Sequence, residues 1–312
     1  MPPPSEQRMS PRPSALRLLV PKYWPTWFGL GLLRVLEPLP LPMLRFMGKW
    51  LGRFVRVLPV SFVRIARRNL ELCMRELSVS EREHLLTQHF ESIGIALFET
   101  AVAWWAPASR IDPFFELIGA EHLHAALAKG KGAILLSAHF TTLEMSGRAL
   151  LQLNLPLNIM YRPTKNEVME RFLSRNRAHH CRRAIRRDDV RTLITALKAN
   201  EPVWYAPDQA YRNKGAQMVP FFGIPCASNT ATSRLVKMSG AAVLPYFPER
   251  LANGRYRMTI LPELDNFPGP DAIADTTRFH HLIEAQVRKV PAQYLWIHRR
   301  FKGLSEDYPN YY

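Results

Sequence analysis

Residues 133–144 read AILLSAHFTTLE, and this stretch decides the fold. Its first half, Ala133 to Ala138, is a short apolar run preceded by Gly130-Lys131-Gly132. This pattern is typical of a strand that is buried on both faces of a sheet, so His139 falls at the carboxyl end of the predicted strand. Because ligands of open α/β sheets bind at that edge, a titratable side chain at this position is well placed for chemistry.

Glu144 follows His139 by five positions, and two interpretations fit it. On one helix the two side chains would point about 140° apart, so they can meet only across a strand-to-helix turn. In the first interpretation Glu144 is the carboxylate that orients His139 as a base. In the second, Thr141 and Glu144 form a capping box at the start of the next helix, and His139 is a buried, hydrogen-bonded histidine.

Strand and helix patterns alternate along the rest of the chain, which is typical of an α/β domain. Strands are predicted at residues 133–138, 157–161, 203–206, 242–247 and 256–261, and helices at 142–153, 166–179, 189–199, 229–238 and 275–290. Two earlier helices are predicted at 61–76 and 80–105, the second capped by Ser80 with Glu83. We expect one α/β domain, residues 61–312, with a central, mostly parallel mixed sheet flanked by helices.

The first 60 residues have a different composition. Residues 1–20 are rich in Pro, Ser and Arg, and this composition predicts a disordered tail. They do not show the basic region, apolar core and small-residue cleavage site of a signal peptide in that order. Residues 21–60 interleave Trp, Phe, Leu and Met with Arg and Lys, and their longest uncharged run, Tyr23 to Leu33, is too short to cross a hydrocarbon core of about 30 Å. We predict a membrane-associated helical segment at the interface; a tilted span and an ordinary core helix are the alternatives.

Overall charge favours an anionic partner. The 312 residues include 42 Lys and Arg against 26 Asp and Glu, a formal net charge of +16, which suits nucleic acid, an anionic membrane or an acidic protein. Cys73, Cys181 and Cys226 lie far apart, so neither a disulfide framework nor a zinc site is predicted. The sequence motifs of metalloproteases, P-loop proteins, nucleophile-elbow hydrolases and Rossmann folds are absent.

The densest basic region runs from Arg162 to Lys198, where eleven cations face four anions. On one helix, Arg171, Arg175 and Arg182 would share a face and Arg177 would project elsewhere. Arg side chains suit phosphate and carboxylate groups, so an anionic headgroup fits this region, and a solvated basic face is the plainer alternative. No recognition helix, zinc finger or RNP motif supports nucleic acid as the partner.

Two more segments fall near the edge that carries His139. Asp208 follows the predicted strand 203–206, so it either binds substrate or an Arg at that edge or forms a turn after Pro207. Residues 220–223, PFFG, predict a turn whose apolar surface would suit a fatty chain.

Six motifs, taken in order, resemble one family. They are KYWPTW at 22–27, H-x4-E at 139–144, YRP at 161–163, WYAPDQ at 204–209, PFFG at 220–223 and YLWIHRRFK at 294–302. This set is similar to the secondary lipid A biosynthesis acyltransferases, in particular the lauroyl (HtrB-type) branch, within the lysophospholipid acyltransferase superfamily. The similarity runs from about residue 20 to the end of the chain.

The resemblance implies an acyltransferase of the bacterial inner membrane whose active site faces the cytoplasm. Its reaction would move a fatty acyl chain, lauroyl in this branch, from acyl carrier protein to the hydroxyacyl chain of a Kdo-lipid IV(A)-type precursor. The expected partners are therefore acyl carrier protein, an anionic lipid A precursor and the membrane. Neither a cofactor, a metal nor nucleic acid is expected.

The motifs also assign residues. His139 and Glu144 take the catalytic positions of the H-x4-E pair. Predicted substrate-binding residues are Arg162, Arg177, with Arg175 as its fallback, Asp208, Gln209, Phe221 and Phe222. Relatives often read Asp-Gln-Asp-Tyr where this chain has Asp208-Gln209-Ala210-Tyr211, so this chain lacks the second Asp of that pattern.

The predicted mechanism is general-base catalysis. His139, with an ordinary pKa of about 6.5, takes the proton of the attacking hydroxyl while Glu144 orients its ring. Backbone N–H groups near Thr141 and Thr142, or an Arg, would stabilise the oxyanion. The alternatives are a glycerolipid acyltransferase that uses the same pair, and a non-enzymatic membrane or nucleic-acid binder that uses the Arg-rich region.

Overall fold

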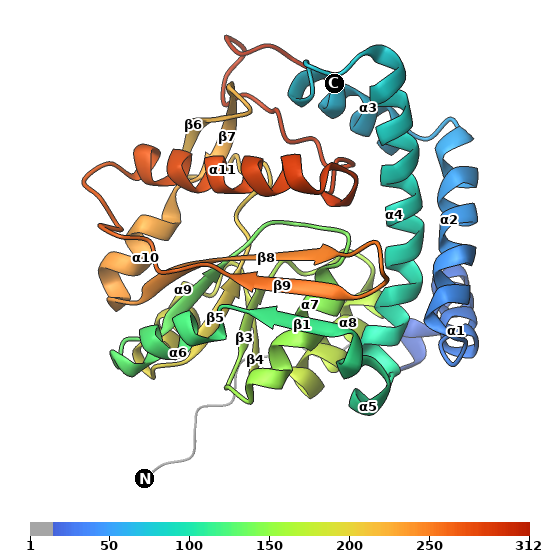
Figure 1. Cartoon of the computed structure of the whole chain (residues 1–312), viewed down its shortest axis with the longest axis horizontal. Coiled ribbons are helices and arrows are strands. Elements are labelled where there is room, and N and C mark those ends of the chain that lie inside the picture. Colours follow the sequence, from blue (N-terminus) through green and yellow to red (C-terminus); the bar gives the residue numbers. More distant parts are fainter. Residues whose placement is uncertain (1–14) are drawn as a thin grey trace.

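A central seven-stranded sheet organises the computed structural model, which describes residues 15–312 (Figure 1). Across the sheet the order is β1-β9-β8-β2-β5-β3-β4. The strands span Phe115–Ile118 (β1), Ala133–Leu136 (β2), Asn158–Tyr161 (β3), Arg183–Arg186 (β4), Pro202–Tyr205 (β5), Ala242–Arg250 (β8) and Tyr256–Ile260 (β9).

Most strand pairs are parallel. Strand β2 pairs in parallel with β5 and β8, and β3 pairs in parallel with β4 and β5, whereas β8 and β9 are antiparallel. All four side chains of β2 are buried, and they alternate between the two faces as strand geometry requires. Ile134 and Leu136 join one apolar cluster, and Ala133 and Leu135 join the other. The prediction of a mostly parallel mixed sheet is confirmed.

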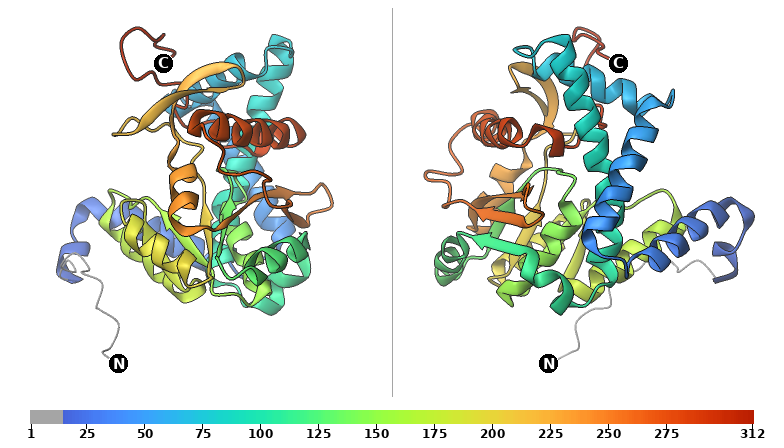
Figure 2. Two further views of the ribbon diagram at one scale, coloured as in Figure 1. Left: turned by 90° about the vertical axis from the view of Figure 1, so that its left-hand side faces the viewer. Right: turned by 45° about the vertical axis from the view of Figure 1, so that its right-hand side comes forward.

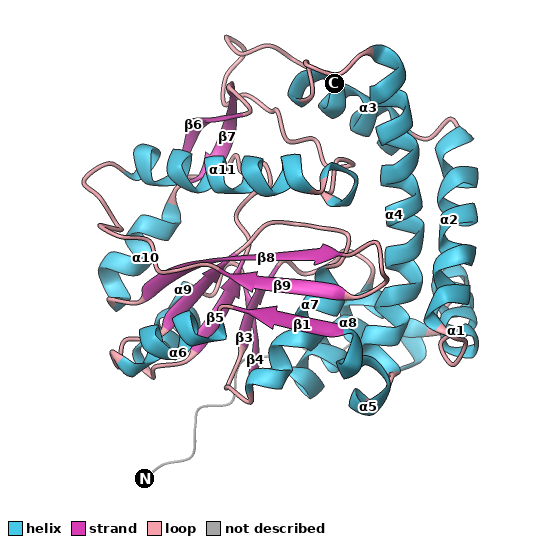
Figure 3. Ribbon diagram, in the orientation of Figure 1, coloured by secondary structure: helices cyan, strands magenta, loops and turns pink. Residues whose placement is uncertain are grey.

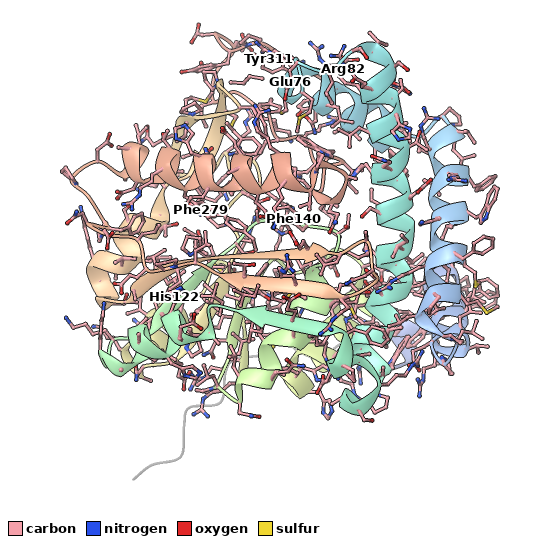
Figure 4. All side chains as sticks on the ribbon, in the orientation of Figure 1. Glu76, Arg82, His122, Phe140, Phe279 and Tyr311 are labelled. Carbon is pink, nitrogen blue, oxygen red and sulfur yellow. The ribbon has the colours of Figure 1, made fainter. Side chains whose placement is uncertain are left out.

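Helices cover both faces of the sheet (Figure 3). The cluster on one face includes residues of α6 (Ala120–Ala128) and α7 (Leu143–Leu150). Helices α9 (Val190–Lys198), α10 (Ala231–Ser239) and α11 (Ala272–Lys289) contribute to the cluster on the other. Phe140 and Phe279 lie between α11 and the sheet (Figure 4). A separate hairpin, β6 (Ala216–Phe221) and β7 (Ile224–Asn229), contacts α11.

Helices from the N-terminal third line one side of the molecule (Figures 1 and 2). They are α1 (Trp24–Leu36), α2 (Leu41–Val57), α3 (Ser61–Cys73) and α4 (Val79–Trp105), followed by the single turn α5 (Ala108–Ile111). Among all helices of residues 15–312, none is both long and apolar enough to cross a membrane. Residues 1–14 of the predicted tail lie outside the described part, and Ala15–Leu18 forms a 3-10 helix.

Glycines set how α2 lies against α4. A Cβ on Gly52 would come 2.0 Å from the Phe90 carbonyl oxygen, and one on Gly94 would come 2.0 Å from the Gly48 carbonyl oxygen. Only glycine permits this approach of the two backbones. The small-residue face of α2 is therefore buried, and its aromatic face is left on the surface.

The prediction omitted strand β1, helix α6 and the hairpin strands β6 and β7, and it differs from the structure in the basic region and at one cap. Helix α8 (Glu167–His180) ends before Arg182, and Arg183–Arg186 forms strand β4, so the expected helical face with Arg182 was wrong. The capping box of α4 uses Ser78 and Glu81, not Ser80 and Glu83. The predicted PFFG turn is confirmed: it joins β6 to β7, with Phe222 and Gly223 both at positive φ, as a tight hairpin turn requires.

Candidate active site

His139 and Asp208 meet where β2 and β5 end. His139 Nδ1 lies 2.5 Å from Asp208 Oδ1, and the backbone N–H of His139 donates to Asp208 Oδ2 at 3.0 Å. The two strands are neighbours in parallel register, so the chain leaves both at the same edge of the sheet. Asp208 is therefore a partner of the histidine and not only a turn residue.

Burial and charge fix the state of this pair. The Asp208 side chain is only 2% exposed. Burial alone would raise its pKa, but the charge and hydrogen bonds of His139 more than offset this, so the pKa of Asp208 lies below its ordinary value. Burial likewise lowers the pKa of His139, and the charge and hydrogen bond of Asp208 raise it more, to a net value above the ordinary one.

These states define which nitrogen can act as a base. An ionised carboxylate only accepts hydrogen bonds, so the neutral imidazole carries its hydrogen on Nδ1, toward Asp208. The lone pair is then on Nε2. The His139 side chain is 26% exposed, so a substrate can reach the ring. Tyr294 completes the arrangement, because its buried hydroxyl donates to Asp208 Oδ2 at 3.2 Å.

The loop after His139 is held by the C-terminal segment and by α4. Thr141 N–H donates to the Gln293 carbonyl oxygen at 2.8 Å, and Leu295 N–H donates to the His139 carbonyl oxygen at 3.0 Å. The Thr141 hydroxyl lies 2.7 Å from the Ser92 hydroxyl. The backbone N–H of Thr141 is thus occupied and is not an oxyanion donor in this arrangement.

Glu144 makes neither of the two contacts expected from the sequence. Its Oε2 accepts from Trp104 Nε1 at 3.0 Å, and its Oε1 lies 3.4 Å from Arg177 Nη2. The N-cap of α7 is Thr142, with no side-chain cap hydrogen bond, so the capping-box interpretation is wrong. Asp208 holds the histidine nitrogen that we expected Glu144 to hold. Within residues 15–312, no hydrogen bond joins Glu144 to His139.

A mostly apolar pocket with a volume of about 80 Å³ lies beside Glu144 and Arg177. Arg177 also lies over the Tyr161 ring, at 5.2 Å from its centroid. The apolar lining comes from α4, α7, β3, β5 and the segments next to them, and includes Ala103, Leu143, Leu150, Leu157, Ile159 and Trp204. The His139 ring lies 6.4 Å, edge-on, from the ring of Trp204. The His139 ring and the pocket are therefore adjacent.

The other predicted site residues lie in different surroundings. Gln209 and Phe221 line a second, very small cavity together with His139 and Asp208. Phe221 is buried, and Phe222 packs on Trp296 with ring centroids 6.2 Å apart. Neither Phe lines the pocket beside Glu144.

Arg162 and Arg175 are exposed and form no ion pair within the part of the chain that is described. Arg177, and not its fallback Arg175, is the arginine that contacts Glu144. Three residues at the site had no assigned role in the sequence: Tyr294, Trp104 and Trp204. Tyr294 and Trp204 both stand inside the quoted motifs, and this was the signal available for them.

The described cysteines are poor nucleophiles. Burial raises the pKa of Cys181 in the apolar pocket to about 11, against the lowering effect of Arg177, and burial also raises the pKa of Cys73 and Cys226. Among residues 15–312, no Ser, Thr or Cys side chain hydrogen-bonds the His139 ring, and no His, Cys, Asp or Glu cluster is arranged to hold a metal ion. This geometry suits a base that activates a hydroxyl group of the substrate.

Comparison with known proteins places this site in a family. Residues 13–303 match the family model described as bacterial lipid A biosynthesis acyltransferase. The chain is 40% identical over 286 residues to the lipid A biosynthesis palmitoleoyltransferase of Escherichia coli (strain K12), covering 91% of this chain and 93% of that protein. It is 36% identical over 297 residues to the lauroyltransferase of the same organism, covering 95% and 97%. To the myristoyltransferase of that organism it is 26% identical over 286 residues, covering 90% and 88%. The chain belongs to the bacterial lipid A biosynthesis acyltransferase family.

Proposed function

We propose that this acyltransferase moves a fatty acyl chain from the thioester of acyl carrier protein to a hydroxyl group on the hydroxyacyl chain of a Kdo-lipid IV(A)-type precursor. The observation that carries the proposal is the His139–Asp208 pair, which places an oriented base beside an apolar pocket. In this proposal the base is His139, as the motif implies, and its orienting carboxylate is Asp208.

The steps balance without a covalent enzyme intermediate. His139 Nε2 takes the proton of the substrate hydroxyl, and the hydroxyl oxygen attacks the thioester carbonyl carbon. The tetrahedral intermediate collapses, the C–S bond breaks, and the imidazolium returns the proton to the thiolate. The products are an ester and a thiol. Asp208 stabilises the imidazolium while it exists, as the acid member of a hydrolase triad does.

Arg177 is our candidate for stabilising the negative charge on the carbonyl oxygen. Its guanidinium lies between Glu144 and the Tyr161 ring and borders the apolar pocket. A fixed cation beside a developing oxyanion stabilises it strongly in a site with little water. Glu144 then acts as a positioning residue that holds Arg177.

The apolar pocket is our candidate for the acyl-chain site. Small and aliphatic side chains surround it, which suits a methylene chain. A lauroyl chain remains the proposal, as the motifs imply. The palmitoleoyltransferase similarity makes a longer, unsaturated chain the second candidate.

Unpaired cations are available for the anionic partners. Arg162, Arg171, Arg175 and Arg187 are exposed and form no ion pair in the described part of the chain. Arg162 and Arg187 directly follow β3 and β4, which end at the same edge of the sheet as β2. These residues suit acyl carrier protein, which is acidic, and the phosphates and carboxylates of the lipid precursor.

We also propose that α1 and α2 lie on the cytoplasmic face of the inner membrane. Most of the large apolar side chains that are exposed in the described residues lie on or near these two helices, including Phe46 at 62%, Trp50 at 56% and Phe54 at 61%. Exposed Arg34, Lys49 and Arg53 lie among them. Aromatic groups with interspersed cations suit the interface of an anionic bilayer. Helix α1 also packs on α8, where Thr26 accepts from Asn166 at 2.9 Å.

Lipid vesicles test this membrane surface. We expect the Trp50→Ser and Phe54→Ser double variant to bind anionic vesicles at least about tenfold more weakly, because each substitution removes an apolar side chain that the bilayer interface would bury. The Val79→Ser and Met238→Ser double variant serves as a matched control, since both side chains are well exposed outside α1 and α2. Equal vesicle binding by both double variants would refute the assignment of this surface.

Mass spectrometry of lipid A tests the reaction. Cells with and without the protein should differ by one acyl chain on lipid A, and the mass difference gives the chain length and the acylated position together. A lipid A profile unchanged by loss of the protein, with a changed glycerolipid profile, would replace the lipid A precursor by a glycerolipid as the acceptor.

A further inference from the structure

Arg300 is a buried cation close to the proposed base. The residue is only 3% exposed. Its Nη1 donates to the Ala227 carbonyl oxygen at 3.1 Å and its Nη2 to Ser228 Oγ at 2.8 Å. Its guanidinium lies 5.3 Å from the centroid of the Phe221 ring. None of these partners carries a charge, and no carboxylate within residues 15–312 forms an ion pair with it.

A single small cavity joins Arg300 to the His139–Asp208 pair. The cavity measures about 10 Å³, and Asp208, His139 and Arg300 all line it. A buried cation is costly unless an anion compensates it. Asp208 is the carboxylate that shares this cavity with Arg300, and the Arg300 charge helps to hold the pKa of Asp208 down.

The other titratable groups around this cavity are neutral near neutral pH. Burial and Arg300 lower the pKa of His280 to about 3, and burial lowers the pKa of His298 to about 4. His280 Nδ1 donates to the Pro220 carbonyl oxygen at 2.7 Å, so its Nε2 accepts from Arg300 at 3.2 Å. Tyr294 and the thiols Cys73 and Cys226 have raised pKa values and carry no charge. Among the residues that line this cavity, Arg300 and Asp208 are thus the two fixed charges. Glu284 and Lys302 lie outside the lining, where the charge of Glu284 raises the pKa of Cys226 and that of Lys302 lowers the pKa of His298.

We propose that Arg300 is a positioning residue for catalysis, the buried counter-charge that keeps Asp208 ionised and opposes protonation of His139. This inference rests on the proposed function of the His139–Asp208 pair. It adds a third member from the C-terminal segment, which also supplies Tyr294. In the resting enzyme Arg300 and Asp208 cancel. A proton on His139 then leaves one net positive charge in the interior, so Arg300 favours return of that proton to the leaving thiolate.

The pH dependence of kcat/KM tests the proposal, measured with the full chain in detergent or vesicles and acyl carrier protein thioester as donor. The acid limb reports the pKa of the free-enzyme base. Arg300→Met removes a positive charge, so protonation of His139 becomes easier. We therefore expect the acid limb to move to higher pH by roughly 0.5–1.5 pH units. Arg300→Lys keeps the charge, and its limb should stay near that of the wild type.

A structural role alone gives a different result. Both Arg300 variants lose the fork of contacts to Ala227, Ser228 and His280, so both should unfold at lower temperature. If they lose stability alike and neither limb moves, Arg300 only holds the fold and the proposal is wrong.

A second pair keeps the test decisive if Arg300→Met does not fold. Ser228→Asp places a carboxylate against Arg300 and neutralises it, so the limb should move up. Ser228→Asn has the same shape without the charge and should leave the limb in place. Identical limbs for these two variants would overturn the proposal. The proposed function fails separately, if His139→Ala keeps normal transfer activity whatever the Arg300 variants do.

Discussion

The two halves of the H-x4-E motif lie in different surroundings. His139 stands at the end of β2, where Asp208 from the end of β5 holds its Nδ1. Glu144 stands in the first turn of α7, where Trp104 and Arg177 hold it beside the apolar pocket. The difference teaches that two residues close together in a sequence motif can each have a different partner in the folded protein. We propose that the His139 region supplies the base, and that the Glu144 region holds the acyl chain and, through Arg177, stabilises the oxyanion.

His139→Ala should give the largest effect. Loss of a general base lowers the rate by about 10²- to 10⁴-fold, and no other described group is placed to replace Nε2. Purified variant and wild type should be compared for acyl transfer at equal protein concentration, with circular dichroism and vesicle binding as controls for folding and association. Transfer at the normal rate would remove His139 from the mechanism.

Asp208→Asn should rank second, with a loss near neutral pH that approaches that of His139→Ala, because Asn lacks the charge that holds the Nδ1 hydrogen in place and the equivalent change in a hydrolase triad costs about 10⁴-fold. The raised pKa of His139 depends on the Asp208 charge. Without that charge the pKa falls, so the acid limb of kcat/KM should move to lower pH. Arg300→Met is the matched comparison, because its acid limb is expected to move the opposite way, to higher pH. An unmoved limb in Asp208→Asn would mean that another group sets the basicity of His139.

Glu144→Gln should have a smaller effect, about tenfold, because Gln can still accept from Trp104 but loses its charge toward Arg177. Its acid limb should stay in place, since Glu144 does not touch the histidine. Kinetics at several pH values separate the two regions. A loss as large as in His139→Ala, together with a shifted limb, would instead restore Glu144 as the orienting carboxylate.

Gly147 gives the mildest expected change, one of product and not of rate. It lines the pocket beside Glu144, and a Cβ there would meet nothing within 4 Å. Gly147→Leu should fill the pocket and favour donors about two to four carbons shorter, whereas Gly147→Ala should fold at least as stably because Ala is the better helix former. Competition between acyl donors of different length, read by mass spectrometry, measures this. An unchanged preference in Gly147→Leu would place the acyl chain elsewhere.

The sequence predicted the elements around the site well. The run from Ala133 to Ala138 is a strand buried on both faces, and all five predicted strands exist with ends shifted by a few residues. Strong apolar periodicity carries this information locally. Strand β4 was missed because Arg183–Arg186 is half exposed at the sheet edge and its side chains resemble a basic helix.

Pairing between distant residues was harder to predict. Asp208 was expected at the same edge as His139, since both follow strands, but which oxygen meets which nitrogen depends on β2 and β5 being neighbours. Their sequence separation of 69 residues carries no such signal. Glu144 had the spacing of a capping box, and tertiary contacts with Trp104 and Arg177 outweighed that local preference. Arg300 lay in a quoted motif without a visible role.

The most direct measurement of the central claim is the pKa of His139 itself. Carbon-13 NMR of protein labelled at histidine can follow this residue, because its resonance is the one that disappears in His139→Gln. We predict a pKa above the ordinary value of about 6.5 in the wild type, a fall in Asp208→Asn, and little change in Glu144→Gln. A His139 pKa that responds to Glu144→Gln and not to Asp208→Asn would contradict the assignment of Asp208 as the partner of the base.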